Sequence, residues 1–358
     1  MLSLPSEPAA RGVNLPRTSS VDRLVRFRLA LTAILAVAVL AVAASAQAYP
    51  WPLKPFNRQH PIRANFGDPR TRFFNTMLTN GLEGPGMFQF HNGIDIAAPG
   101  DTPVYPVASG TARLIDGAAV SVRSKGRTFQ YFHISPTILN GDHVVAGRTV
   151  LGYVLPAYAH VHLTEIRGTR VWNPLAAGGI APYRDKTVPE VDSIAMRGSW
   201  SLVPLDPARV CGSVSIVATA FDVPPLPVPG PWAGFPVSPS YVSWSFDHVG
   251  GVAYERNVPA ADFRTRLPTN PHFWNVYARG SFQNAPRFSN QQFVIAGRYV
   301  YNLANLVDTR WYPNGAYEVT VSVRDMRGNQ SEATQRFTIA NQPGTETGCL
   351  PQVPSSPP

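Results

Sequence analysis

The chain has 358 residues, of which 44% are hydrophobic and 15% are charged, which excludes a wholly disordered protein and leaves room for two cores. Thirty-six prolines and 28 glycines interrupt short apolar stretches, and these residues break helices more readily than short strands joined by turns. We therefore expect a mostly β protein. The net charge of +9 comes from dispersed basic residues, without a Lys or Arg run or a basic helix, so no nucleic-acid partner is expected.

Residues 1–48 have the pattern of an export segment. Three arginines within residues 23–28 precede the uncharged run Leu29–Ala44, and small residues at alternate positions follow in Ala44-Ser45-Ala46. This pattern predicts either a cleaved signal peptide or a retained N-terminal membrane anchor. Both alternatives place the rest of the chain outside the cytoplasm, either secreted or in the cell envelope.

The chain has two cysteines, Cys211 and Cys349. In an oxidising compartment two cysteines without another partner are expected to form a disulfide, which in the chain-entropy model contributes roughly 4 to 5 kcal/mol for a loop of this length. Neither cysteine has a Cys-x-x-Cys or histidine neighbour, so a metal or redox role is not expected.

Two regions of strands follow the export segment. Residues 49–185 contain short β runs separated by Gly-containing turns, whereas residues 188–342 contain longer alternating segments. Residues 343–358 are rich in Pro, Ser, Thr and Gly and are predicted to form a flexible tail. The clearest predicted strands are Thr102–Val107, Thr111–Ile115, Ala119–Val122, Thr128–His133, Val150–Val154, Val161–Ile166, Val214–Ala220, Tyr241–Phe246 and Ala316–Val323.

Three histidine settings in the first region carry chemistry. In the segment from His91 to Asp95 an Asn-Gly turn can bring the imidazole and the carboxylate together, and both groups are ordinary zinc ligands. His160 and His162 lie two positions apart on a predicted strand, so their side chains point to the same face. His133 lies in an aromatic, apolar strand.

Each setting taken alone has a simpler interpretation. The first is consistent with a surface histidine and a turn-capping aspartate, the second with two solvated histidines on an edge strand, and the third with a hydrogen-bonded core histidine. Taken together, they supply what a catalytic zinc needs, which is three protein ligands, an open position for water, and neighbouring groups that handle protons and the oxyanion. His143, in a Gly-Asp loop, is expected to be an ordinary loop residue.

The order and spacing of all three histidine motifs resemble the lysostaphin/LytM-type zinc endopeptidases. The resemblance runs from about Ile62 to Leu175, and it includes Phe66-Gly67 upstream and Trp172-Asn173-Pro174 at the end. It implies a groove-shaped antiparallel β fold. The family cuts short peptides of bacterial peptidoglycan, either cross-bridges or stem peptides, so peptidoglycan peptides are the implied partner.

The resemblance also implies a role for each site residue. Zinc would be held by His91, Asp95 and His162, and His133 and His160 would flank the metal-bound water as catalytic histidines.

Three segments depart from the family pattern. Leu155–Ala159 replaces the usual Gly-, Ser- and Thr-rich approach to the last two histidines. Thr164 stands where the family commonly has an acidic residue, and Glu165 follows it. The segment Arg70–Gln89 is rich in Phe and Asn. These changes concern the rim of the groove and leave the ligands intact.

The second region resembles bacterial immunoglobulin-like modules, because residues 311–339 contain a turn, an alternating strand, a second turn and a final strand. The predicted fold class is therefore all-β, with an antiparallel LytM-like groove followed by an immunoglobulin-like β-sandwich. Residues 250–310 fit this pattern less well, and we interpret them as an insertion with its own small cluster. Wall binding, substrate positioning and spacing are all open as functions of this region.

The functional hypothesis is an exported zinc metalloendopeptidase that acts on peptidoglycan peptides. The alternative is a non-hydrolytic peptidoglycan-binding or regulatory envelope protein that uses the same groove. A third alternative is a structural surface protein in which the second region dominates. The sequence makes no prediction of the bond cut or of the oligomeric state.

Overall fold

The computed structural model describes residues 48–73, 84–198, 201–285 and 295–342, together with Gly344 and Cys349. The predicted export segment and the predicted tail lie outside the described residues, apart from Ala48, Gly344 and Cys349. The described residues belong to one compact unit that is nearly all β, as predicted. Within these residues, no helix has both the length and the apolar character needed to span a membrane.

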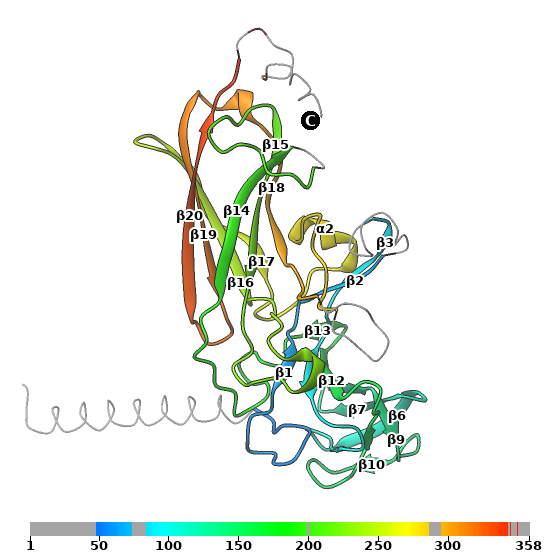
Figure 1. Ribbon diagram of the computed structural model, residues 1–358. Coiled ribbons are helices and arrows are strands. Elements are labelled where there is room, and N and C mark those ends of the chain that lie inside the picture. The colour runs from blue at the N-terminus through cyan, green and yellow to red at the C-terminus, as the bar shows by residue number, and fades with distance from the viewer. Residues whose placement is uncertain are drawn as a thin grey trace, which may run out of the picture. The chain divides into compact units, whose positions relative to one another are not determined.

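The first part of this unit contains an eight-stranded antiparallel sheet and a three-stranded one (Figure 1). The strands of the larger sheet are β1 (Ile62–Ala64), β4 (Ile94–Ala97), β6 (Gly110–Asp116), β7 (Ala119–Ser124), β8 (Arg127–Phe132), β10 (His143–Val144), β12 (His160–Arg167) and β13 (Arg170–Trp172). Their order is β1-β4-β12-β8-β7-β6-β10, with β13 paired to β12. The smaller sheet joins β5 (Pro103–Val104), β11 (Gly152–Val154) and β9 (Ile134–Pro136).

Strand β12 lies inside the larger sheet, between β4 and β8. Its first six residues are buried although several are polar. Buried polar side chains need hydrogen-bond or ionic partners, so the polar positions of β12 require specific partners on the neighbouring elements. The sheet thus places the His160–His162 pair in a protected position.

The second part contains a three-stranded sheet, a four-stranded sheet and short helical turns. The strands are β14 (Glu190–Gly198), β15 (Ser213–Phe221) and β18 (Val300–Asp308) in the first sheet, and β17 (Ala253–Asp262), β16 (Tyr241–His248), β19 (Gly315–Arg324) and β20 (Gln330–Ile339) in the second, each in spatial order. The helical turns are η1 (Gly230–Trp232), η2 (Asn270–His272), α2 (Phe273–Val276) and η3 (Thr309–Trp311).

The interpretation of residues 250–310 as an insertion is wrong in part. Strand β17 pairs with β16 and strand β18 pairs with β15, so both are members of the two sheets. Strand β17 was not predicted because it is an edge strand with mostly exposed residues, and its sequence therefore lacks the expected alternation. The predicted final hairpin is present as β19 and β20, whereas the immunoglobulin-like assignment stays a prediction.

The predicted disulfide is present, because Cys211 and Cys349 are joined by an S–S bond of 2.04 Å. Its two ends are separated by 138 residues. The bond therefore ties the segment after β20 to the segment that leads into β15.

A two-stranded hairpin, β2 (Pro69–Phe73) with β3 (Gly86–Phe90), joins the two parts of the unit. The ring of Phe90 packs against Phe273 at 5.4 Å and Tyr277 at 5.9 Å between centroids. The Tyr277 hydroxyl donates a hydrogen bond of 2.8 Å to the Gly67 carbonyl. Burial of large aromatic rings stabilises such an interface strongly, so the hairpin that precedes the histidine motifs is held by the second part of the unit.

Candidate metal centre

The residues of the candidate site come from β4, β12 and the turn before β4. The β4 and β12 strands are antiparallel, and their register sets His162 opposite Asp95. His91 follows β3 on the Asn-Gly turn. Gly93 in that turn lies so close to β12 that an added Cβ would meet the Leu163 carbonyl oxygen at 2.4 Å and His162 Nε2 at 2.7 Å. Only glycine fits there, so the turn can bring His91 close to the strand pair.

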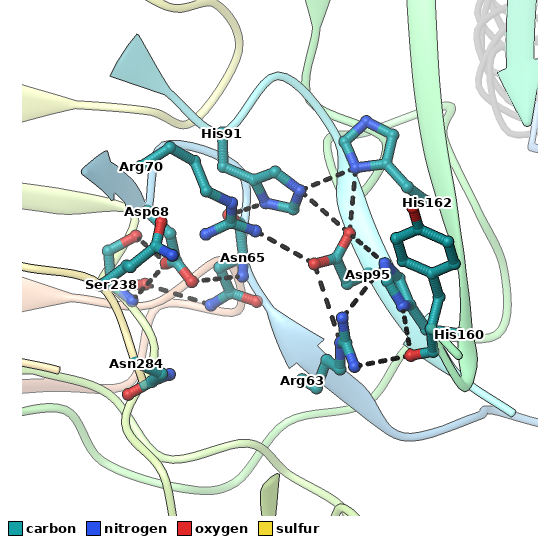
Figure 2. Close-up of polar contacts among 12 residues, drawn as sticks. Arg63, Asn65, Asp68, Arg70, His91, Asp95, His160, His162, Ser238 and Asn284 are labelled. Atoms are coloured by element: carbon teal, nitrogen blue, oxygen red, sulfur yellow. Dashed lines mark hydrogen bonds and ion pairs between the residues drawn. The ribbon is translucent and has the colours of Figure 1, made fainter. Parts of the chain in front are cut away.

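The three predicted ligand residues converge (Figure 2). His91 Nε2 lies 2.8 Å from His162 Nδ1 and 3.0 Å from Asp95 Oδ1. His162 Nδ1 lies 2.9 Å from the same carboxylate oxygen. The three atoms form a nearly equilateral triangle, and their residues are between 3% and 8% exposed.

Outer partners determine which imidazole nitrogens face this triangle. His91 Nδ1 lies 2.8 Å from the Asn65 carbonyl oxygen, which can only accept, so Nδ1 carries the proton and Nε2 presents its lone pair. Thr164 Oγ lies 2.8 Å from His162 Nε2 and can accept its proton in the same way. Burial lowers the pKa of His91 to about 3, with the nearby Arg70 charge adding to the effect, so the ring is neutral at neutral pH.

This donor set fits a divalent metal ion such as zinc. Two nitrogen lone pairs and one carboxylate oxygen point at a common centre, which is electrostatically unfavourable unless a cation lies among them. A tetrahedral zinc with ligand distances of about 2.1 Å separates its ligands by about 3.4 Å, close to the edges of the observed triangle. Coordination of His91, Asp95 and His162 therefore needs only small movements.

Two arginines face the free side of Asp95. Arg70 donates a hydrogen bond of 3.0 Å from Nη2 to Oδ2, and Arg63 Nε lies 3.8 Å from the same oxygen. Burial alone would raise the pKa of Asp95, but its close electrostatic contacts with His91 and His160 and its hydrogen bonds with His160 and His162 outweigh burial and hold the pKa well below its usual range. Asp95 is therefore a carboxylate at neutral pH, as metal binding requires.

The two remaining histidines lie beside the triangle. His160 Nδ1 lies 2.9 Å from the Tyr158 carbonyl oxygen, so Nδ1 is the donor and Nε2 is left as an acceptor. That Nε2 lies 3.3 Å from Arg63 Nη2 and 3.4 Å from Asp95 Oδ1. His133, just after β8, has its ring 4.5 Å from that of His160 and 6.3 Å from that of His162 between centroids.

The environment of His133 keeps its ring neutral. Partial burial lowers the pKa of His133 to about 4, and the neighbouring His160 adds to the effect. A neutral imidazole offers one N–H donor and one acceptor nitrogen. All five histidine and aspartate positions singled out from the sequence are thus gathered at one site, whereas His143 is exposed in β10 and is not part of it.

The structure explains the departure at Thr164 and Glu165. Thr164 contacts the outer nitrogen of the ligand His162 directly. Glu165 lies on the other face of β12, where it accepts a hydrogen bond of 2.9 Å from Tyr49 and pairs with Arg127 and Arg167. Glu165 therefore has a structural role on that face and does not replace the missing acidic residue beside the three predicted ligands.

A separate cluster of three carboxylates is formed by residues that follow this site in the chain. Asp185, Asp222 and Asp325 are buried, and their oxygens lie within 4.8 Å of one another. Burial raises the pKa of Asp222 to about 8, and the Asp185 charge adds to the effect. Asp222 is therefore mostly protonated at neutral pH.

A cleft of about 450 Å³ opens over the candidate metal centre. Its lining includes Arg63, Arg70, His133 and Tyr158 from the first part of the unit, and Trp232 and Gln283 from the second. Sequence reasoning missed the arginines and the two residues of the second part. The proximity of the arginines to Phe66-Gly67 is the one local signal that could have drawn attention to them, whereas Trp232 and Gln283 have none.

No family model matches the sequence, and no curated protein matches it. Solved structures similar to parts of the chain include Helicobacter pylori Csd3, with 20% identity and a TM-score of 0.25 over 36% of this chain and 34% of that chain. Pseudoalterin, a deep-sea M23 metalloprotease, has 19% identity and a TM-score of 0.24 over 38% of this chain and 80% of that chain. A point mutant of the catalytic domain of prophage-encoded M23 protein EnpA from Enterococcus faecalis has 27% identity and a TM-score of 0.23 over 32% of this chain and 97% of that chain. The match therefore spans about a third of Csd3.

Proposed function

We propose that the protein is an exported zinc metalloendopeptidase that hydrolyses peptide bonds in bacterial peptidoglycan. One observation carries the catalytic part of the proposal. His91, Asp95 and His162 present three ligand atoms within 3.0 Å of one another, and two further imidazoles lie beside them. The assignment of peptidoglycan as substrate rests on the sequence resemblance to the lysostaphin/LytM-type enzymes.

The metal would be held by His91 Nε2, Asp95 Oδ1 and His162 Nδ1. When bound there, zinc polarises a carbonyl group and lowers the pKa of a coordinated water towards about 7. His160 is oriented to accept a proton at Nε2, since its Nδ1–H is directed to the Tyr158 carbonyl. His133, neutral at neutral pH, can donate its N–H to the oxygen on which negative charge develops.

Outer contacts hold these groups in orientation. Asn65 fixes the ring of His91, and Thr164 contacts the ring of His162. Tyr158 directs His160 through its carbonyl and packs its own ring on His133 at 4.2 Å between centroids. The catalytic groups are therefore preorganised, which reduces the reorganisation needed to reach the transition state.

The proposal is tested with the purified full chain and purified cell walls of differing cross-bridge chemistry. We expect one zinc per chain by metal analysis, release of new amines from the walls, and loss of that release with a chelator. Mass analysis of the soluble fragments identifies the bond that is cut. Bound zinc without amine release would instead support the non-hydrolytic binder, and a chain that takes up no zinc would contradict the metal assignment.

A further inference from the structure

The cleft over the metal centre has a wall that belongs to the second part of the unit. Trp232, Gln283 and Asn284 line it together with residues of the first part. Asn284 is buried, and both ends of its side chain are used, because Nδ2 donates to the Pro236 carbonyl and Oδ1 accepts from the Gly297 amide. Asn284 therefore has a structural role, which leaves Trp232 and Gln283 as the groups that a ligand in the cleft can contact.

Trp232 is placed beside the catalytic side of the cleft. Its ring lies 3.8 Å from the guanidinium carbon of Arg63, an arrangement in which the cation is attracted by the aromatic face. Arg63 in turn donates to the Tyr158 carbonyl at 3.0 Å and lies 3.3 Å from His160 Nε2. The half-buried indole thus forms an apolar surface within two contacts of the predicted proton acceptor.

Gln283 is held by one end of its side chain. The side-chain Oε1 of Gln283 accepts a hydrogen bond of 3.1 Å from the backbone amide of Thr71. The backbone amide of Gln283 donates a hydrogen bond of 3.1 Å to Thr71 Oγ. Since a backbone amide can only donate, the side-chain oxygen must face Thr71, which fixes the orientation of the carboxamide. Within the described part of the chain, the Nε2 group of Gln283 has no hydrogen-bond partner, so its two N–H groups are available to a ligand.

The character of this wall indicates what binds to it. The only carboxylate among the described residues that line the cleft is Asp95, whose oxygens face the metal centre and the arginines. Arg63, Arg70 and Gln283 Nε2, which also line the cleft, are by contrast hydrogen-bond donors. Donors beside an aromatic face suit an extended peptide, because its backbone carbonyl oxygens can accept hydrogen bonds while one of its side chains packs against the ring.

We propose that Trp232 and Gln283 are substrate-contact residues, which bind the peptide to be cut and align it over the metal centre. Trp232 packs against the peptide, and Gln283 Nε2 donates a hydrogen bond to one of its carbonyl oxygens. This inference rests on the proposed function for the identity of the peptide. If Trp232 and Gln283 contact the peptide, the second part of the unit forms part of the substrate-binding site and is more than a spacer.

Paired variants test the inference. Gln283→Glu keeps the acceptor for Thr71 and replaces the donor by a second acceptor, and Trp232→Ala removes the ring. Gln335→Glu and Trp311→Ala are the matched controls, because Gln335 is half-buried like Gln283, Trp311 is exposed, and neither lines the cleft. Zinc content and the thermal midpoint are measured for every variant, so that a folding defect is recognised.

The probe is one soluble wall peptide, purified from digested walls and used for all variants. We expect KM to rise about tenfold or more for Gln283→Glu and Trp232→Ala with little change in kcat, which is the signature of lost ground-state and transition-state binding. Trp232→Phe should restore most of the loss, and both controls should match the wild type. A KM within about twofold of the wild type for both cleft variants at full zinc content would overturn the inference.

A calorimetric binding measurement separates this inference from the proposed function. If the wild type binds the peptide without cutting it, the proposed hydrolysis fails, yet weaker binding by both cleft variants would still support the contact roles. If the wild type cuts the peptide and the cleft variants bind it as tightly as the controls, only the contact roles fail. A wild type that neither binds nor cuts any wall peptide contradicts both.

Discussion

The imidazole of His133 is stacked on the ring of Tyr158, with 4.2 Å between the centroids and 18° between the ring planes. His133 has a positive φ of 66°, so its backbone does not follow the strand that precedes it. Stacking on the Tyr158 ring therefore fixes the direction of the His133 side chain. Tyr158 lies in the Leu155–Ala159 segment that departs from the family pattern, and it is a positioning residue for His133.

Tyr158→Ala should reduce kcat by about tenfold while zinc content stays at the wild-type level, because the ring that orients His133 is lost and the backbone carbonyl remains. Tyr158→Phe should retain the stacking and stay within about twofold of the wild type. Steady-state kinetics with metal analysis of the same samples checks both. Equal loss in the Ala and Phe variants would point to the hydroxyl and against stacking.

His162→Ala should abolish zinc retention and hydrolysis together, since it removes one corner of the ligand triangle. His133→Ala should keep the zinc and lower kcat by about 10² to 10⁴, as expected for a group that acts on protons or on the oxyanion. Metal analysis after dialysis and rate measurements distinguish the two. Full zinc in the His162 variant would contradict the ligand assignment.

Gly67→Ala should destabilise the whole unit. Gly67 has a φ of +97°, and an added Cβ would meet the ring of Phe263 at 2.4 Å, so both backbone strain and overpacking apply, at a cost of about 2 to 4 kcal/mol. Gly126→Ala is the matched control, because Gly126 has a φ of +80° with open space around it and should lose only about 1 kcal/mol. Denaturant unfolding measures the difference. Equal effects would show that the contact with Phe263 adjusts freely.

Asp222 should make stability depend on pH. Its pKa is raised to about 8 in the folded protein, so the folded state binds a proton more tightly than the unfolded chain. The stabilisation is fully present below about pH 4 and is lost as the pH rises through about 8, with a slope of up to about 1.4 kcal/mol per pH unit. Asp222→Asn should flatten this dependence in thermal unfolding between about pH 5 and pH 9. Asp192→Asn, on an exposed residue of β14, should leave it unchanged.

The ligand triangle was within reach of sequence reasoning because its determinants are local. An Asn-Gly turn brings His91 towards Asp95, and alternation along one strand puts His160 and His162 on the same face. Six strands of the first part, β5, β6, β7, β8, β11 and β12, and the final hairpin were also predicted, since each is a local run of strand-forming residues bounded by turns. What brings Asp95 opposite His162 is strand pairing, which the resemblance supplied and the structure shows.

The parts that sequence reasoning missed depend on packing between distant segments. Arg70 reaches Asp95 only because the β2–β3 hairpin is folded back and held by aromatic rings from residues 263–277. Strand β17 lacks an alternating pattern because most of its residues are exposed. Trp232 enters the cleft from a Pro-rich loop that reads only as a connection between strands.

The contact between Thr71 and Gln283 joins residues that are 212 positions apart. A ribosome must therefore complete most of the chain before both walls of the cleft exist. The three predicted zinc ligands lie in the first half of the polypeptide, but the cleft above them is complete only when the second half has been synthesised and has docked. Completion of the candidate site is in this sense ordered in time by the positions of Thr71 and Gln283 along the chain.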